Sequence, residues 1–282
     1  MSLLKDIIID TGADCLKMLP FLFAAFLILE ALEHYSGEFT NKVLVKVGAA
    51  GPIFGALAGC VPQCGFSVMA ANLFAGGVLS PGTLISVFIA TSDEAVLILL
   101  GNPGRGREIF FLLAVKVVIA VMAGYLTDMF WKSRPEHPKH LEDLCHDCGC
   151  HDHHGIIRPA LNHTVKIILY LFLFSGVLNL LTETIGIDQL SAFFLGDTIF
   201  QPFIAALIGL IPNCAASVIL TQLFLDGVIS FASVIAGLCT GAGVGLIVLF
   251  KMNSDKKENV KIIVLLYLTA VAAGILLSLT GL

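Results

Sequence analysis

Long apolar stretches separated by short polar turns run through this sequence. A helix needs about 20 apolar residues to cross the hydrocarbon core of a bilayer, and most of these stretches approach that length. We predict helical segments at residues 15–35, 43–60, 63–79, 82–100, 108–131, 159–182, 189–209, 213–229, 231–250 and 260–281. The pattern therefore predicts an all-α polytopic membrane protein with about ten transmembrane or re-entrant segments.

Two pairs of these segments are short, rich in glycine, and joined by a turn that contains proline. The turns read VPQCG (61–65) and IPNCA (211–215). Proline removes a backbone donor, and irregular backbone at membrane depth needs protein or a water-filled cavity around it. We therefore expect helices broken at Pro62 and Pro212, in pairs that either cross the bilayer or form re-entrant hairpins.

The second half of the chain repeats the first at an offset of 150 residues. Residues 62–95 and 212–245 share ten identities in 34 positions aligned without a gap. The identical pairs are Pro62/Pro212, Cys64/Cys214, Ser67/Ser217, Val68/Val218, Leu73/Leu223, Phe74/Phe224, Gly77/Gly227, Val78/Val228, Ser80/Ser230 and Ile85/Ile235. Two unrelated apolar helices of similar composition are the alternative. Because five segments per half is an odd number, the second copy would enter the membrane from the opposite side, which predicts two inverted repeats.

Composition agrees with a membrane protein. The 282 residues are 57% hydrophobic and 13% charged, against about 25% charged residues in soluble domains, and the mean hydropathy is +0.93. Several of the eight cysteines lie in predicted membrane segments, which is unlike a secreted disulfide framework. The start of the chain lacks the features of a removable signal peptide. The net charge of −5 gives no indication of a nucleic-acid partner.

The chain divides into a first membrane repeat at 1–131, a hydrophilic loop at 132–158 and a second membrane repeat at 159–282. Nine Lys and Arg residues fall on one side of the predicted topology and three on the other. Because basic loops face the cytoplasm, we expect a bacterial inner-membrane protein with both termini outside and the loop cytoplasmic.

Two adjacent carboxylates, Asp93 and Glu94, lie near the middle of the apolar run TLISVFIATSDEAVLILL (83–100). A carboxylate at the bilayer centre costs about 2.5–3.5 kcal/mol even on the insertion scale, so it normally faces a cavity, an ion path or a partner. One carboxylate could bind a cation while the other exchanges a proton. An ion pair with Lys116, which also lies in an apolar segment, is the alternative for one of the two.

Thiol and polar side chains near the proline turns are candidate ligands. Thiolates favour soft or borderline ions, whereas amide and carbonyl oxygens favour Mn or Mg; a free cysteine also packs well as a small hydrophobe. Cys60 and, more weakly, Cys239 are further soft-ligand candidates. The predicted ion path comprises Asp93, Glu94, Cys64, Cys214, Gln63, Asn213, Pro62, Pro212, Ser67, Ser217, Asn72, Gln222, Thr91 and Ser92.

The loop HPKHLEDLCHDCGCHDHH (137–154) has the composition of a metal-binding tract. Cys145 and Cys148 have the two-residue spacing of zinc ligands. The candidate ligands are His137, His140, Cys145, His146, Cys148, Cys150, His151, His153 and His154. We expect the loop to capture, deliver or sense ions, with a solvated linker as the alternative.

The stretch GCVPQCGFSVMAANLFAGGVLSPGTLISVFIATSDEA (59–95), the second Pro-x-Cys turn at 212–214 and the histidine-rich loop resemble a family of ten-segment heavy-metal exporters. Members of that family are labelled arsenic efflux proteins or manganese transporters. The chain is more distantly similar to arsenical permeases, whose turn carries more cysteines than are present here. The resemblance covers nearly the whole chain and implies a secondary exporter of a metal or metalloid.

These observations together predict proton-coupled export of a divalent transition metal such as Mn, Fe or Zn by alternating access. No phosphate-binding loop occurs, so an ion gradient would drive transport. A permease for arsenite, an organoarsenical or a small sulfur-containing anion is the alternative, and a thiol oxidoreductase using Cys60 and Cys64 is a minor one. We expect no enzymatic activity and no required cofactor. The expected partners are the lipid bilayer, the transported metal ion or metalloid, protons and a second copy of the chain.

Overall fold

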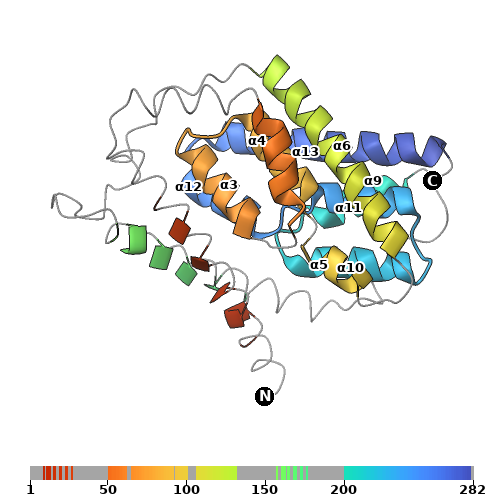
Figure 1. Ribbon diagram of the computed structural model, residues 1–282, viewed down its shortest axis with the longest axis horizontal. Coiled ribbons are helices and arrows are strands. Elements are labelled where there is room, and N and C mark those ends of the chain that lie inside the picture. Colours follow the sequence, from red (N-terminus) through yellow and green to blue (C-terminus); the bar gives the residue numbers. More distant parts are fainter. Residues whose placement is uncertain are drawn as a thin grey trace.

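The computed structural model describes residues 50–61, 65–91, 93–100, 106–131 and 200–280, together with isolated helical positions between 9 and 27 and between 157 and 176. Every regular element among them is a helix, as expected (Figure 1). The elements are the helix Ala50–Gly59, α3 (Gly65–Ala75), α4 (Pro81–Ala90), α5 (Asp93–Leu100), α6 (Gly106–Phe130), α9 (Gln201–Gly209), α10 (Cys214–Leu225), α11 (Phe231–Thr240), α12 (Val244–Met252) and α13 (Lys256–Leu279).

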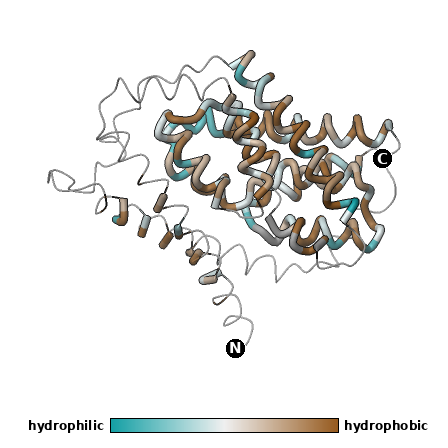
Figure 2. Tube along the Cα trace, viewed as in Figure 1, coloured by the Kyte–Doolittle hydropathy of each residue, from teal (hydrophilic) through white to brown (hydrophobic). Residues whose placement is uncertain are grey.

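Three stretches of the described chain are helical, apolar and long enough to cross a bilayer: Gly106–Phe130, Phe231–Met252 and Lys256–Leu279. The second of these combines α11 and α12 and contains a short interruption. Figure 2 shows hydrophobic residues along the helices, with hydrophilic positions gathered toward helix ends and turns. This pattern fits a multi-pass membrane protein, in which each span satisfies its own backbone hydrogen bonds.

The broken helices lie inside and the long helices lie outside. Every residue of α4 is buried, and in α11 only Phe231 is partly exposed. The apolar window of Phe231–Met252 is 89% buried, against 33% for the windows in α6 and α13. Helix α6 packs along α4, and α13 packs along α11. The outer helices therefore present apolar side chains to the lipid while the inner, interrupted helices form the core.

The helices of the two halves correspond at the offset of 150 residues. Helices α4 and α11 match at both ends, and each begins after a serine whose side chain accepts a backbone N–H of the first turn. Helices α3 and α10 each end at a glycine with positive φ, 75° at Gly77 and 73° at Gly227. At both ends the N–H of the glycine and the N–H of the following valine donate to carbonyls of the last helical turn, an arrangement that favours glycine. The identical residues of the repeat thus produce identical turns.

The predicted continuous segments 82–100 and 231–250 are wrong, because each is interrupted near its middle. Helix α4 ends at Ala90 and α5 begins at Asp93, with Thr91 in an extended conformation at the helix end (φ −54°, ψ 127°). Helix α11 ends at Thr240 and α12 begins at Val244, after Gly243 with φ 52° and ψ −137°. Gly243 adopts a conformation that a side chain would strain. We call these two interruptions the first-half break and the second-half break.

The proline turns are only partly described. Helix α9 ends at Gly209 and α10 begins at Cys214, so Pro212 lies in a non-helical stretch at 210–213. The corresponding turn at 62–64 lies outside the described residues. The structure therefore adds two helix breaks, one between α4 and α5 and one at 241–243, to those predicted at the prolines.

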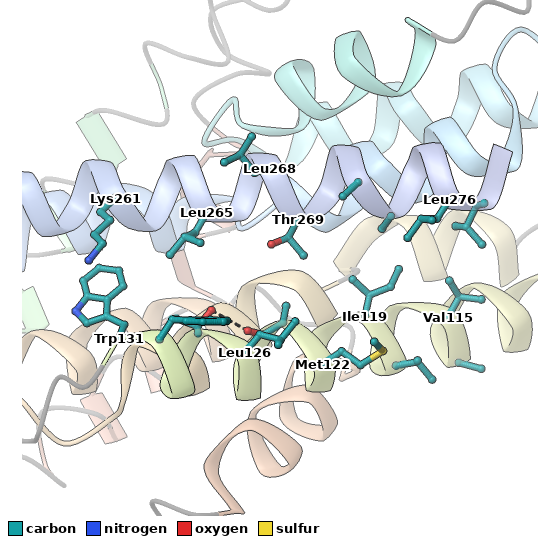
Figure 3. A pocket seen from close by; sticks show the side chains of 18 residues that line it. Val115, Ile119, Met122, Leu126, Trp131, Lys261, Leu265, Leu268, Thr269 and Leu276 are labelled. Carbon is teal, nitrogen blue, oxygen red and sulfur yellow. Dashed lines mark hydrogen bonds between the residues drawn. The ribbon is translucent and has the colours of Figure 1, made fainter. Parts of the chain in front are cut away.

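Helices α6 and α13 run antiparallel on either side of an apolar groove of about 910 Å³. At one end Lys261 lies over the Trp131 ring, 3.8 Å from its centroid, and at the other end Val115 faces Leu276 (Figure 3). Trp131 follows the C-terminus of α6, whereas Lys261 lies near the N-terminus of α13. Two helices at equivalent positions of the repeat therefore point in opposite directions.

Glycines allow the outer helices to approach the inner ones at equivalent places. A Cβ atom at Gly124 of α6 would lie 2.8 Å from both Gly82 O and Pro52 Cβ. A Cβ at Gly274 of α13 would lie 2.8 Å from Pro202 Cβ and 3.2 Å from Ala232 O, which are the positions 150 residues further on. The packing of the two halves is therefore equivalent in detail at these contacts.

Candidate functional site

A fully buried lysine joins the two helix breaks. Lys116 of α6 has no solvent exposure, and its ammonium donates hydrogen bonds to Thr91 O at 2.5 Å and to Leu238 O at 2.7 Å. Thr91 caps the C-terminus of α4, and Leu238 lies in the last turn of α11. One cation thus bonds to backbone oxygens from both halves of the chain.

The breaks create the acceptors that Lys116 uses. The carbonyl of Leu238 would accept Ala242 N–H in a continuous helix, but that N–H bonds to Thr240 O at 2.7 Å instead. The last carbonyls of a helix lack intrahelical partners and carry a partial negative charge. Because no water reaches a buried carbonyl in the membrane interior, an ammonium group at this place stabilises both helix ends.

Two thiols lie near the same ammonium. Cys239 is completely buried and Cys60 is half-buried, and both interact electrostatically with Lys116. Cys60 follows the helix Ala50–Gly59 in the first half, and Cys239 lies in α11 in the second half. Both belong to the predicted set of soft-ligand candidates, and both lie within electrostatic range of the Lys116 ammonium.

The carboxylates Asp93 and Glu94 are the first two residues of α5. They therefore follow the first-half break directly, rather than lying in the middle of a continuous helix as predicted. Acidic residues in a first turn interact favourably with the positive helix N-terminus. Their side chains lie outside the described part of the structure, so the predicted ion pair with Lys116 stays a prediction.

The buried amide of Asn72 has no hydrogen-bond partner in the described part of the chain. Asn72 of α3 is 1% exposed, and neither its side-chain oxygen nor its nitrogen is bonded there. Buried polar atoms are nearly always bonded, and an orphan calls for an explanation such as a ligand or water. The aligned Gln222 of α10 is exposed and donates to Asp226 at 3.0 Å. The two predicted amides thus have different surroundings.

The other predicted path residues are described unevenly. Ser67 is fully buried, and Gly245, in the first turn of α12, packs closely against it. Asn213 is buried, whereas Pro212 and Ser217 are partly exposed. Of the remaining residues, only the backbone of Cys214 is described, and Pro62, Gln63, Cys64 and Ser92 lie outside the described residues.

The histidine- and cysteine-rich loop at 137–154 also lies outside the described residues, so its metal ligands stay a prediction. Within the described part of the chain, no group of three or more His, Cys, Asp and Glu side chains is placed to hold a metal ion. The side chains of Asp93, Glu94 and Cys214 lie outside that part.

The groove between α6 and α13 offers little polar chemistry. Its lining is apolar except for Lys261 at one end and two threonines, and many of its side chains, such as Met122 and Leu268, are more than half exposed. No carboxylate, thiol or imidazole lines it. Such a surface on two outer helices faces lipid. The site with chemistry is the junction of the two breaks around Lys116.

Sequence reasoning had considered Lys116 only as the partner of a carboxylate. Its bond to Leu238 spans 122 residues of sequence, and no local pattern reveals such a contact. A lysine within the apolar run FFLLAVKVVIAVMAG was the available signal, because a charged group at membrane depth normally has a functional reason.

Comparison with known protein families identifies the family of this chain. A family described as proposed 10TM heavy-metal exporters matches residues 4–195. This range covers the first half, the hydrophilic loop and the start of the second half. No curated protein and no solved structure matched the chain. The match extends over more than half of the sequence and agrees with the apolar helices described above, and the chain therefore belongs to this family of ten-transmembrane heavy-metal exporters.

Proposed function

We propose that this chain exports a divalent heavy-metal ion by proton-coupled alternating access, at a site between the two helix breaks. The observation that carries the proposal is the Lys116 junction, where the end of α4 from the first half meets the end of α11 from the second. Broken helices whose ends meet near the bilayer midplane are the usual place of substrate and coupling-ion sites in secondary transporters.

The two halves act as inverted repeats in this proposal. Three observations support the inversion: corresponding helix bounds at an offset of 150, the antiparallel course of α6 and α13, and reciprocal contacts. Helix α3 packs on α12, and their counterparts α10 and α5 also pack on each other. Contacts of this reciprocal kind arise when two copies are related by a twofold axis. Rocking of one half against the other would expose the junction to each side in turn.

Each group at the junction has a role in the proposed cycle. Asp93 or Glu94, at the start of α5, supplies the negative charge that compensates a metal dication. Cys60, Cys239 and the orphan amide of Asn72 are candidate soft and oxygen ligands near the inner helices. Protonation of the carboxylate from the outer side lowers its affinity for the ion and releases it. The divalent metal is a transition-metal ion such as Mn, Fe or Zn, which these sulfur and oxygen ligands would suit.

The histidine-rich loop and the orientation in the membrane also have roles in the proposed transport. The tract at 137–154 gathers metal ions on the cytoplasmic side and passes them to the membrane repeats, which lie at 1–131 and 159–282. Both termini lie outside a bacterial inner membrane, as the distribution of Lys and Arg indicates.

One observation favours a second candidate, export of arsenite, an organoarsenical or a small sulfur-containing anion. The described junction holds two thiols and a cation, Cys60, Cys239 and Lys116, and thiols are soft ligands. This reaction would not need the carboxylates that follow the first-half break.

A flux panel on the purified protein in liposomes separates these candidates. Mn, Fe, Zn, Co, Ni and Cd are tested beside arsenite, with and without a pH gradient, and with a protonophore as the control. We expect flux of a divalent metal that requires the gradient. Arsenite flux without divalent-metal flux would replace the leading proposal with the second one, and absence of flux for every substrate would contradict both.

A further inference from the structure

We propose that Lys116 fills a monovalent-cation site, so that its ammonium group is a covalently tethered replacement for a coupling cation such as Na⁺. Two ligands of this site are backbone oxygens, one from each half: Thr91 O at 2.5 Å and Leu238 O at 2.7 Å. The inference deepens the proposed function and rests on it for the interpretation of the junction as a transport site.

The geometry is that of a cation site made from backbone. In transporters with broken helices, unwound carbonyls and the C-terminal ends of half-helices coordinate Na⁺ or H⁺. Here the two acceptors are of these two kinds: Thr91 O lies in the unwound first-half break, and Leu238 O lies in the last turn of α11. Both helix ends carry partial negative charge. A single cation between them satisfies the carbonyls of both halves at once.

The ammonium group at this site belongs to a helix other than the two broken ones. Lys116 belongs to α6, which packs on α4 from the lipid side, and its side chain reaches the interior with no solvent exposure. The equivalent position in α13 is Leu266, which is also fully buried. Of these two equivalent positions only the first-half one carries a cation, and that cation lies where the two halves meet. Such a site needs no dissolved sodium ion.

The proposal predicts chemical rescue. The variant Lys116→Ala removes three methylene groups and the ammonium, which is the shape of propylammonium. With the carbonyls of Thr91 and Leu238 left unsatisfied, the variant should unfold at a lower temperature than the native protein. A cation that binds the vacated site stabilises the folded state in proportion to the logarithm of its concentration. We expect propylammonium to raise the midpoint of thermal unfolding in detergent by about 3 °C or more, and Na⁺ to raise it less.

Matched controls separate a cation site from a cavity. Leu112→Ala removes a buried side chain one turn earlier on the same face of α6, and Lys116→Met fills the space without a charge. Neither variant should respond to propylammonium. Propanol has the same shape without the charge, and tetramethylammonium has the charge without a donor; neither should rescue Lys116→Ala. Equal stabilisation by propanol, equal stabilisation of Leu112→Ala, or no response to any cation would overturn the proposal.

A measurement on the native protein covers the case in which Lys116→Ala does not fold. Replacing Na⁺ by choline at constant ionic strength should change neither the unfolding midpoint nor the flux of the native chain, because the site is already filled. A flux that requires Na⁺ would contradict the inference. The rescue experiment reports stability rather than transport, so a native protein that moves no metal would refute the proposed function and leave this inference standing.

Discussion

The two helix breaks have equivalent surrounding helices but different side chains. Both follow a ten-residue buried helix with a serine cap, and both lie under an outer helix that packs through a glycine. The first-half break continues into Asp93 and Glu94, whereas the second-half break has Gly243 and Val244 at the same places. Lys116 likewise corresponds to Leu266.

This difference fits the proposed alternating access. In that mechanism the two halves need similar helical scaffolds, because each half takes the position of the other in turn. The charged groups need to occur only once, because the proposed site between the halves serves both conformations. Gly243, at φ 52°, shows that the second-half break depends on backbone freedom where the first-half break carries a carboxylate.

The largest stability difference between the halves is expected at Lys116 and Leu266. Lys116→Met leaves two buried carbonyls without a donor at the negative ends of two helices, and each orphan group costs about 1–3 kcal/mol. We expect a loss of about 2–5 kcal/mol in the free energy of unfolding in detergent micelles. Leu266→Met conserves volume and should cost less than about 1.5 kcal/mol. Equal losses in the free energy of unfolding at the two positions would contradict the claim that Lys116 stabilises both helix ends.

Enlarging the glycines at which α6 and α13 pack on the inner helices should cost similar stability in both halves. Gly124→Val and Gly274→Val each force side-chain atoms against the backbone and a proline of the neighbouring helices, and overpacking of this kind costs about 2–3 kcal/mol. Unfolding measurements on both variants should agree within about 1 kcal/mol. Gly106→Val is the control, because nothing lies within 4 Å of a Cβ at Gly106. A large loss in only one half would break the equivalence.

Replacing the aligned amides Asn72 and Gln222 by leucine should have different effects on stability. Asn72→Leu removes two unsatisfied buried atoms, which should raise the free energy of unfolding by about 1–2 kcal/mol and lower metal flux if the amide is a ligand. Gln222→Leu, on an exposed surface, should change stability by less than about 0.5 kcal/mol. If Asn72→Leu destabilised the protein as much as an ordinary core substitution, the orphan amide would have an unrecognised structural partner.

The smallest expected effect concerns the serine caps. Ser80→Ala and Ser230→Ala each remove a side-chain acceptor from the first turn of an inner helix, at a cost of about 1 kcal/mol. Ser80 also donates to Asp128 at 2.8 Å, and Asp128 accepts Gly82 N–H as well. The loss should therefore be slightly larger at Ser80 than at Ser230, as thermal unfolding of the two variants can show. The reverse order would mean that the Asp128 contact contributes no stability.

The turns of the fold could be predicted from sequence because local residues determine them. Gly77 and Gly227 end helices, and Ser80 and Ser230 begin them, and all four are identities of the repeat. The predicted segments at 108–131 and 260–281 likewise correspond to α6 and α13 within a few residues.

The breaks and their junction could not be predicted in the same way. The polar residues that begin at Thr91 are flanked by apolar residues on both sides, so the segment 82–100 is long enough to predict one continuous helix, and no proline marks the interruption. In the second half Gly241 and Gly243 were the available signal, because glycines close together weaken a helix. The contact of Lys116 with Leu238 depends on tertiary packing across 122 residues, which hydrophobic patterning does not encode.

Proton-driven flux in proteoliposomes tests the central claim most directly. The metal found in the substrate panel is measured with the native chain, with the double variant Asp93→Asn/Glu94→Gln, and with Glu258→Gln as a control carboxylate away from both breaks. We expect the double variant to fold but to lose at least about tenfold in flux, the equivalent of about 1.4 kcal/mol in the barrier, while the control retains native flux. Native flux in the double variant would contradict the claim.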